Sequence, residues 1–287
     1  SSNRTGSFYM LLSVICFSVM DILVKLTTSN YPIGEIAFFR GLFGLIPIFF
    51  LIPKDKAFTF FKTKKPTLHF IRAFAGTFAM ISTFIGVKYM KLADVVSIAQ
   101  ATPVFVTIFS IIFLKEVVGY RRWLSVIAGL IGVLFITKPG TSLFNIYCIF
   151  PIFFCIGFSI VAVSIKRLSK TEPDYLIAFY FTALLIIISS TAFFFEEWKM
   201  PSILDFFYLF MIGICGSIAN LFMTTAYRRA DASLITPLKY LSVLSAIFFG
   251  YYIFSEIPSV STIIGAIIII ISSFIIFKRE QVKNKKR

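Results

Sequence analysis

Ionisable side chains are scarce in this sequence. Asp, Glu, Lys and Arg together make up 14% of the 287 residues, whereas hydrophobic residues make up 58%, and the mean hydropathy is +0.91. Soluble globular domains contain about 25% charged residues. The low charge content therefore excludes an ordinary soluble domain and predicts an all-α integral membrane protein, for which the lipid bilayer is the first partner.

Residues suited to nucleophilic catalysis and metal binding are also few. The only histidine, His69, has no evident Ser or Cys partner with which to form a nucleophile–base pair, so we interpret it as a residue at the membrane interface. The four cysteines lie in apolar runs without metal-ligand spacing. No Gly-rich phosphate loop ending in Lys and Ser or Thr is present. We expect no enzyme, no metal site and no cofactor.

Acidic residues are outnumbered: 13 Asp and Glu face 28 Lys and Arg, for a net charge of +15. The basic residues cluster in short connections between apolar runs, not on a soluble face, so nucleic acid is not an expected partner. If the N-terminus is cytoplasmic, 21 basic residues, Arg72 among them, fall on inner segments and 4 on outer segments. Because positive charge marks the cytoplasmic side, both termini are predicted to be cytoplasmic.

Ten apolar runs fill almost all of the chain. About 20 residues of helix cross the hydrocarbon core, where each backbone polar group must bond within its own segment. The first run contains Asp21 and Lys25 and is followed by no small-residue cleavage site, so we expect a span and not a signal peptide. The ten expected transmembrane helices cover residues 8–28, 34–53, 69–88, 92–114, 121–138, 145–167, 174–195, 203–226, 231–254 and 258–277.

The sequence repeats itself at an offset of about 140 residues. The matched residues include Glu116 with Glu256, Lys25 with Lys166, and Phe17-Ser18 with Phe158-Ser159. Because each copy has five spans, an odd number, the second copy begins on the opposite side of the membrane. Inverted repeats of this kind are typical of transporters, with the substrate bound between the halves. We expect a first repeat over 1–140 and a second over 141–287, ending in a basic cytoplasmic tail.

Polar side chains within the spans are the functional candidates, because they are costly in lipid and usually face the protein interior or water. At a rise of about 1.5 Å per residue, Asp21 and Arg40 fall at the same depth, so we expect them to meet as an ion pair. The residues expected to bind substrate are Asp21, Arg40, Phe39, Gln100, Phe158, Ser159, Tyr180, Asn220, Lys239 and Tyr240.

Simpler roles stay open for some of these residues. Lys25 and Arg40 lie near enough to the outer surface to extend toward it. Gln100 and Asn220 are also explained by hydrogen bonds between neighbouring helices. Lys239 lies nine residues into its span, and we expect it to face a cavity.

Candidate hinges and gates lie in the fourth and ninth spans. Pro103 and Pro237 interrupt these spans and free backbone carbonyls, which is tolerated where a cavity or a neighbour satisfies them. Glu116 and Glu256 end the same spans, where they act either as gates or as interfacial caps.

Several motifs resemble those of the EamA branch of the drug/metabolite transporter superfamily, over nearly the whole chain. They are Glu35-Ile-Ala-Phe-Phe-Arg40, Ala101-Thr-Pro103-Val, Leu114-Lys-Glu116, Ala230-Asp-Ala-Ser-Leu-Ile-Thr-Pro237-Leu-Lys-Tyr240 and Phe254-Ser-Glu256-Ile-Pro258. The resemblance implies ten helices in two inverted copies, both termini inside, and transport of a small organic solute without ATP hydrolysis.

Within that branch, Met20-Asp21, Phe38-Phe39-Arg40 and His69-Phe-Ile-Arg72 look like the motifs of bacterial S-adenosylmethionine uptake carriers. The resemblance implies a secondary transporter in the bacterial inner membrane that moves an amino acid or a derivative by alternating access. Arg40 and Asp21 would then hold a carboxylate and an amine. Export of other small organic solutes or drugs is the alternative, ahead of a channel or an intramembrane enzyme. The sequence leaves the substrate, the direction, proton coupling or counterflow, and the oligomeric state open.

Overall fold

The structure is a computed structural model that describes residues 2–56, 58–105, 107–108, 119–138, 144–229 and 236–285. All regular secondary structure in these ranges is helical. Six helices are long and apolar enough to cross a membrane: α1 (Ser2–Thr27), α2 (Ile33–Leu51), α3 (Pro66–Tyr89), α7 (Ile149–Leu168), α8 (Asp174–Thr191) and α9 (Ile203–Arg229). Four further helices contain shorter apolar stretches: α4 (Leu92–Ala99), α6 (Tyr120–Thr137), α11 (Leu241–Phe254) and α12 (Val260–Lys285). Single 3₁₀ turns lie at Lys54–Lys56, Ile146–Cys148, Ala192–Phe194 and Thr236–Tyr240.

Most predicted spans agree with the observed helices to within a few residues at both ends. The expected span 34–53, for example, is α2 at Ile33–Leu51, and 121–138 is α6 at Tyr120–Thr137. The exceptions are α1, which begins before its predicted span, and α12, which continues beyond it. The fourth and ninth spans differ, because neither is a single continuous helix. The fourth is divided after α4, and the ninth contains a 3₁₀ turn before α11.

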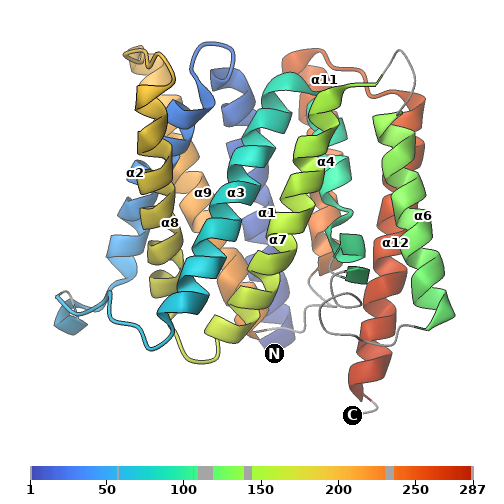
Figure 1. Ribbon diagram of the computed structural model, residues 1–287, viewed down its shortest axis with the longest axis horizontal. Helices are drawn as coiled ribbons and strands as arrows, with labels where there is room; N and C mark the ends of the chain where they lie inside the picture. The colour runs from blue at the N-terminus through green and yellow to red at the C-terminus, as the bar shows by residue number, and fades with distance from the viewer. Residues whose placement is uncertain are drawn as a thin grey trace.

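The helices run side by side in one bundle, with both chain termini at the same end (Figure 1). We call this the termini end and the opposite end the far end. Helices distant in sequence pack together in pairs: α1 with α9, α3 with α7, α2 with α8, α4 with α11, and α6 with α12. Each pair joins one helix from the first half of the chain to one from the second, so the core lies between the halves.

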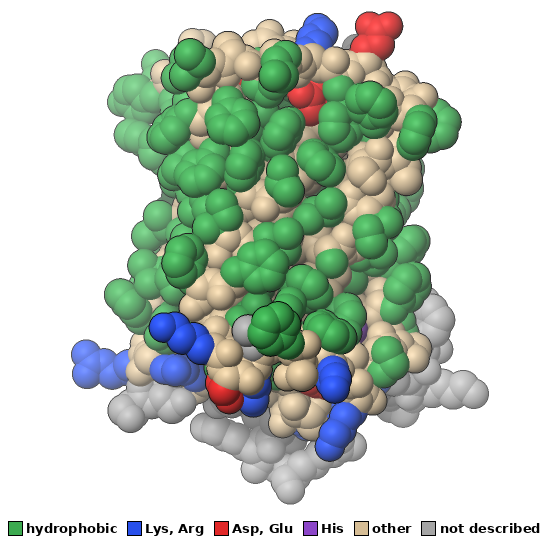
Figure 2. All heavy atoms as spheres, turned by 90° about the vertical axis from the view of Figure 1, so that its left-hand side faces the viewer, with side chains coloured by type: hydrophobic (Ala, Val, Ile, Leu, Met, Phe, Trp, Pro, Cys, Tyr) green, Lys and Arg blue, Asp and Glu red, His purple; other side chains and the backbone are tan. Residues whose placement is uncertain are grey.

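On the face shown in Figure 2, apolar side chains form a band across the middle, and Lys and Arg side chains gather near the termini end. Large apolar side chains are strongly exposed on several helices, including Phe8, Phe50, Phe70, Phe194 and Phe248. A soluble monomer rarely exposes so continuous an apolar surface. The band therefore suits a surface in contact with lipid.

Close helix contact at α6 and α12 depends on two glycines. A Cβ added at Gly265 would lie 2.7 Å from the carbonyl oxygen of Gly132, and one added at Gly132 would lie 2.9 Å from the carbonyl oxygen of Gly265. Real Cβ atoms do not approach a backbone oxygen so closely, so only glycine allows the two backbones this separation. Small residues at a helix interface let packing in lipid replace the hydrophobic effect that is absent there.

Candidate functional site

A central cavity of about 350 Å³ lies between the two halves of the bundle. Its volume falls within the range of about 300–1,000 Å³ that is usual for small-molecule sites. Most of its lining is apolar, and the polar part consists of hydroxyl, amide and charged side chains. The lining residues with charged or amide groups are Asp21, Arg40, Arg72, Gln100, Lys166, Asn220 and Lys239.

Arg40, on α2, is one of the most deeply buried side chains of the protein, with 2% of its surface exposed. Its guanidinium carbon lies 5.1 Å from the ring centre of Phe181 on α8. Nε and Nη1 have no hydrogen-bond partner among the described residues. Gly216 on α9 provides the space, because a Cβ there would lie 3.0 Å from Nε of Arg40. Arg40 is therefore a buried cation with donors to spare, not a side chain that extends to the surface.

Arg72, on α3, approaches the same aromatic ring. Its guanidinium carbon lies 4.4 Å from the ring centre of Phe181, and Nη2 donates to Oδ1 of Asn220 at 3.1 Å. Nε and Nη1 have no partner in the part of the chain that is described. Arg72 was counted with the basic residues of the inner segments, and the structure buries it within α3, with 2% of its surface exposed. The missed signal is Gly76, one turn later, where a Cβ would lie 2.4 Å from Nη1 of Arg72.

Asp21 and Arg40 line the same cavity but do not form the expected ion pair. The two ion pairs observed among the described residues are Lys25 with Glu256 and Arg228 with Asp174. Matched depth did not suffice, because it does not fix the direction in which a side chain leaves its helix. Arg40 turns toward the ring of Phe181, where the face of the aromatic system attracts a cation.

Lys239 lies close to the cavity wall formed by α7. Its Nζ is 4.1 Å from the ring centre of Phe158, and both residues line the cavity. Gln100 also lines it, and Nε2 donates to Oγ of Ser242 at 3.0 Å, so this amide joins α4 to α11. Tyr240, which precedes α11, lines the cavity as well.

Three residues that were expected to bind substrate lie outside the cavity lining. Phe39 stacks on Phe43 in a cluster of aromatic side chains. Ser159 is buried and donates to the carbonyl oxygen of Cys155, one turn earlier on its own helix. Tyr180 donates to the carbonyl oxygen of Phe61. Each belongs to a span with cavity-lining neighbours, but it leaves the helix on another face.

His69, which was expected at the membrane interface, lies in the first turn of α3 and does not face the molecular surface. The side chain is completely buried, and its ring centre lies 4.6 Å from that of Tyr180. Packing against Tyr180 shields the imidazole from both lipid and water.

The fourth span is interrupted where it meets the cavity. Helix α4 ends at Ala99, and a turn at Gln100 and Ala101 precedes the next helical residues. Pro103 has no N–H to donate to the carbonyl oxygen of Ala99, and Oγ1 of Thr102 donates to this oxygen instead, at 2.8 Å. Unwound backbone at the membrane midplane is tolerated where it lines a cavity, as it does here.

Of the other candidate hinge and gate residues, Pro237 and Glu256 are among the described residues. Pro237 lies in the 3₁₀ turn Thr236–Tyr240 that precedes α11. Glu116 lies outside the described residues. Glu256 follows α11 at the far end and accepts a hydrogen bond at Oε2 from the backbone N–H of Leu92, at 2.8 Å.

Lys25 joins Glu256 to two further elements at the far end. Its Nζ lies 2.6 Å from Oε1 of Glu256 and donates to the carbonyl oxygens of Val87 and Met90, at 3.3 and 2.6 Å. The end of α1 is thereby tied to the ends of α3 and α11 and, through Glu256, to the start of α4.

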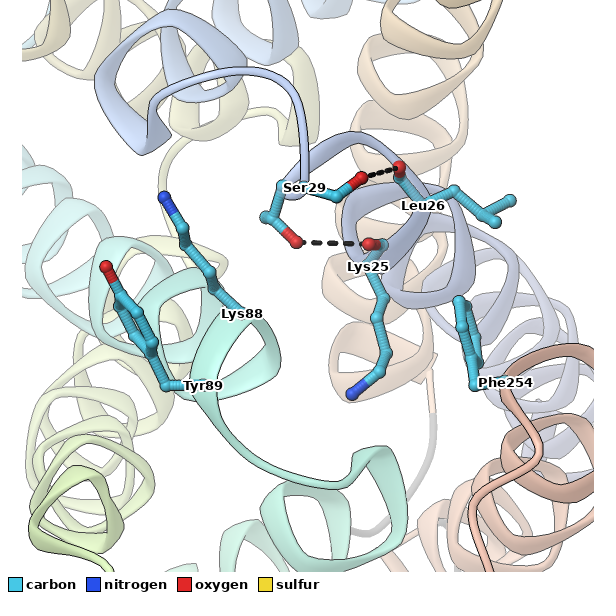
Figure 3. A pocket seen from close by; sticks show the side chains of 7 residues that line it. Lys25, Leu26, Ser29, Lys88, Tyr89 and Phe254 are labelled. Atoms are coloured by element: carbon cyan, nitrogen blue, oxygen red, sulfur yellow. Dashed lines mark hydrogen bonds between the residues drawn. The ribbon is translucent and has the colours of Figure 1, made fainter.

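A second pocket, of about 400 Å³, opens at the far end beside Lys25 (Figure 3). Figure 3 shows Lys88 and Tyr89 of α3 on one side and Phe254 of α11 on the other. Asp21, one turn before Lys25 on α1, lines the central cavity. The Lys25–Glu256 ion pair therefore lies between the far pocket and the central cavity.

The sequence matches the profile of the EamA-like transporter family twice, over residues 4–138 and 145–278. The chain belongs to this family. Membership makes it a transporter of the drug/metabolite superfamily, and its apolar helices make it a multi-pass membrane protein. A small-molecule substrate and a lipid membrane fit that assignment.

Two similar proteins are named as transporters of particular small metabolites. An S-adenosylmethionine uptake transporter of Rickettsia felis is 29% identical over 98% of this chain and 96% of its own length. The pseudopaline exporter CntI of Pseudomonas aeruginosa is 26% identical over 94% of each chain. A solved crystal structure of 15% sequence identity shares the fold, with a TM-score of 0.65 over 95% of this chain and 96% of its own.

Proposed function

We propose that this protein is a secondary carrier that moves a small organic metabolite across the bacterial inner membrane by alternating access. The observation that supports this function best is the central cavity. It lies between helices of both family-matched stretches and contains buried cations without a described anionic partner. Ionisable groups inside a membrane protein usually mark a substrate or ion pathway.

The packing of the helices supports two inverted five-helix repeats, 1–140 and 141–287. If the halves exchange roles, the contact of α1 with α9 becomes the contact of α7 with α3, and both are observed. The contacts of α2 with α8, α4 with α11 and α6 with α12 map onto themselves under the same exchange. The proposed repeats nearly coincide with the two family matches. The excess of Lys and Arg at the termini end favours cytoplasmic termini.

The shape of the cavity suits one state of an alternating-access cycle. Lys166 and Tyr227, near the ends of α7 and α9 at the termini end, belong to its lining. At the far end, the Lys25–Glu256 ion pair ties the helices together. We therefore interpret this arrangement as a carrier closed on the outside, whose cavity extends toward the cytoplasm.

The relatives suggest the class of cargo. Those named above are an S-adenosylmethionine uptake transporter and a pseudopaline exporter, so we propose an amino acid or a derivative as cargo, with S-adenosylmethionine as one candidate. The second name favours export of another small solute as the alternative function. Direction follows from gradients, and proton coupling and substrate counterflow are both compatible with the proposed cycle.

In the proposed site, Arg40 binds a carboxylate of the cargo and Asp21 binds an amine. Gln100, Asn220 and Tyr240 supply further hydrogen bonds. Phe158 and Lys239, which contact each other, form another part of the lining. Pro103 and Pro237, at the interruptions of the fourth and ninth spans, are the proposed hinges.

Transport in proteoliposomes tests the proposal. A thermal-shift screen of amino acids, organic acids and S-adenosylmethionine identifies a ligand, because binding to the native state raises its stability. We expect saturable counterflow of that ligand, abolished by Arg40→Ala and by Asp21→Ala. Lys199→Ala, at an exposed outer position, is the control and keeps wild-type flux. Unsaturable flux in the wild type, or wild-type activity in both cavity variants, would contradict the proposal.

A further inference from the structure

Positive charge prevails in the central cavity. Two arginines and two lysines line it, and the only carboxylate among its described lining residues is Asp21. Arg40 and Arg72 belong to α2 and α3, whereas Lys166 belongs to α7 and Lys239 to the turn before α11. With every group in its usual ionisation state, the empty site has a large excess of positive charge.

The two guanidinium groups lack the carboxylate partner that a buried structural cation normally has. Each has 2% of its surface exposed, and both lie over the ring of Phe181, so two like charges share one aromatic side chain. No carboxylate of the described residues is within ion-pair distance of either group. A buried charge without a partner is strongly destabilising, which is why proteins normally pair it.

Hydrogen-bond donors without a partner also indicate a place for an anionic ligand. Nε and Nη1 of Arg40 and the same two atoms of Arg72 are buried donors without a partner in the described chain. The planar fork of a guanidinium matches the two oxygens of a carboxylate, and such charge-assisted pairs are among the strongest hydrogen bonds in proteins. Asn220 fixes Arg72 by accepting from its Nη2, which leaves the other edge for a ligand.

We infer that the cargo is an organic anion with at least two carboxylates, one of which binds between Arg40 and Arg72. This inference rests on the proposed function and narrows its substrate class. One carboxylate neutralises only one of the two guanidinium groups, and the lining also contains Lys239, which lies against Phe158. A second carboxylate on the cargo neutralises the charge of Lys239, and Asp21 binds an amine on the same molecule.

The inference disfavours one candidate cargo. S-Adenosylmethionine has a carboxylate, an ammonium and a sulfonium group, so its net charge is positive. Such a solute adds positive charge to a cavity that already has an excess, and the only described carboxylate in the lining is Asp21. An amino acid derivative with extra carboxylates removes the excess instead.

Ligand binding by the purified full chain tests the inference. The probes are L-aspartate, L-glutamate and citrate, each compared with a derivative of zero net charge: L-asparagine, L-glutamine and trimethyl citrate. S-Adenosylmethionine is the cationic probe. We expect at least one polycarboxylate to bind at least tenfold more tightly than its neutral partner and more tightly than S-adenosylmethionine. If no polycarboxylate exceeds its partner, or if S-adenosylmethionine binds most tightly, the inference is overturned.

Variants show whether the two arginines provide the preference. Arg72→Gln is expected to remove at least tenfold of the affinity for the preferred anion, and Arg72→Lys is expected to restore part of it because charge returns without the fork. Lys199→Gln, at an exposed position, is the control and keeps wild-type affinity. An unchanged preference in Arg72→Gln contradicts the assignment. Should this variant fail to fold, the comparison of probes on the wild type still decides.

Counterflow separates this inference from the proposed function. Saturable exchange of a polycarboxylate supports both. Saturable exchange confined to neutral or cationic solutes keeps the carrier and overturns the anionic cargo. Flux that rises linearly with concentration for every probe overturns the carrier itself.

Discussion

Lys25 and Glu256 form an ion pair of 2.6 Å that joins the end of α1 to the segment after α11. Both side chains are largely shielded, with 11% and 18% of their surface exposed. Glu256 also accepts from the first backbone N–H of α4, where the helix dipole favours a negative charge. The pair therefore stabilises one closed arrangement of the far end, and this stabilisation is lost when the helices separate.

Removing the charge of Glu256 is expected to open the far end. Glu256→Gln replaces a hydrogen bond between charged groups, worth about 1.5–3 kcal/mol, by one with a neutral acceptor, worth about 0.5–1.5 kcal/mol, so the contact with Lys25 weakens by about 1–2 kcal/mol. A difference of this size changes a population ratio roughly 5- to 30-fold. With the four native cysteines replaced by serine, Thr83→Cys in the cavity wall should react faster with a membrane-impermeant maleimide from outside. The rate of labelling measures the effect.

The matched control for this experiment is Glu197→Gln, an exposed acidic residue on the connection before α9. It is expected to leave the labelling rate at the wild-type value. Equal labelling of Glu256→Gln and Glu197→Gln would show that the ion pair does not hold the far end closed.

Gly76→Ala is expected to impair binding while leaving the fold nearly intact. The added Cβ would lie 2.4 Å from Nη1 of Arg72 and 3.0 Å from the ring of Phe181. Because the nearest atom is the end of a flexible side chain, the guanidinium moves and the backbone does not. We expect about a tenfold loss of ligand affinity, which equals about 1.4 kcal/mol. Isothermal titration gives the affinity and thermal unfolding gives the stability.

Gly119→Ala serves as control for this substitution, because nothing lies within 4 Å of a Cβ at that position. It is expected to change neither quantity. A large drop in the Tm of Gly76→Ala with unchanged affinity would contradict a role for Gly76 in placing Arg72.

Asp174→Ala is expected to lower stability without affecting transport. Asp174 lies in the first turn of α8, binds Arg228 and accepts from Oγ1 of Thr225 at 2.8 Å. The aspartate and the arginine are 20% and 35% exposed, so solvent screens their attraction. We expect a loss of about 1 kcal/mol, from the ion pair together with the helix dipole. Thermal unfolding in detergent measures it.

Added salt should reduce the difference between wild type and Asp174→Ala, because salt screens partly exposed charges. Asp55→Ala, in the exposed turn Lys54–Lys56, is expected to behave like the wild type. A loss of transport in Asp174→Ala at unchanged stability is the result that would overturn this assignment.

Gly265→Val is expected to separate α6 from α12. Its side chain would meet the backbone oxygen of Gly132 and Cγ1 of Ile136, at 2.7 and 2.6 Å from the added Cβ. A backbone oxygen cannot move aside, so the cost is that of overpacking, about 1–3 kcal/mol. The Tm in detergent should fall clearly, whereas Ile264→Val, on the exposed side of the same helix, should change it little. Equal stability of the two variants would mean that these helices are not held by close contact.

The sequence predicted the spans well because lipid imposes a simple rule. An apolar run of sufficient length must be helical, so the bounds of α2 and α6 follow from composition alone. The choice of candidates followed from a related rule, because polar side chains within a span usually face the protein interior or water. Six of the other residues expected to bind substrate line the same cavity as Asp21: Arg40, Gln100, Phe158, Asn220, Lys239 and Tyr240.

What the sequence could not supply was the rotation of each helix about its axis. Ser159 follows the cavity residue Phe158 but points elsewhere, and its hydroxyl bonds to its own helix. The ion pair expected between Asp21 and Arg40 is absent for this reason. Arg40 turns instead toward Phe181, which lies on a helix far away in sequence. Arg72 was missed because it lies close to a span end, where a basic residue usually reaches the headgroups.

The room beside Arg40 exists only because position 216 has no side chain. Substitutions at the two positions must therefore occur in a preferred order during divergence. A lineage that first loses the arginine is then free to accept alanine or serine at position 216. A lineage that alters the glycine first passes through a protein whose guanidinium is displaced. Among distant relatives, glycine without the arginine should accordingly be common, and the arginine without the glycine should be rare.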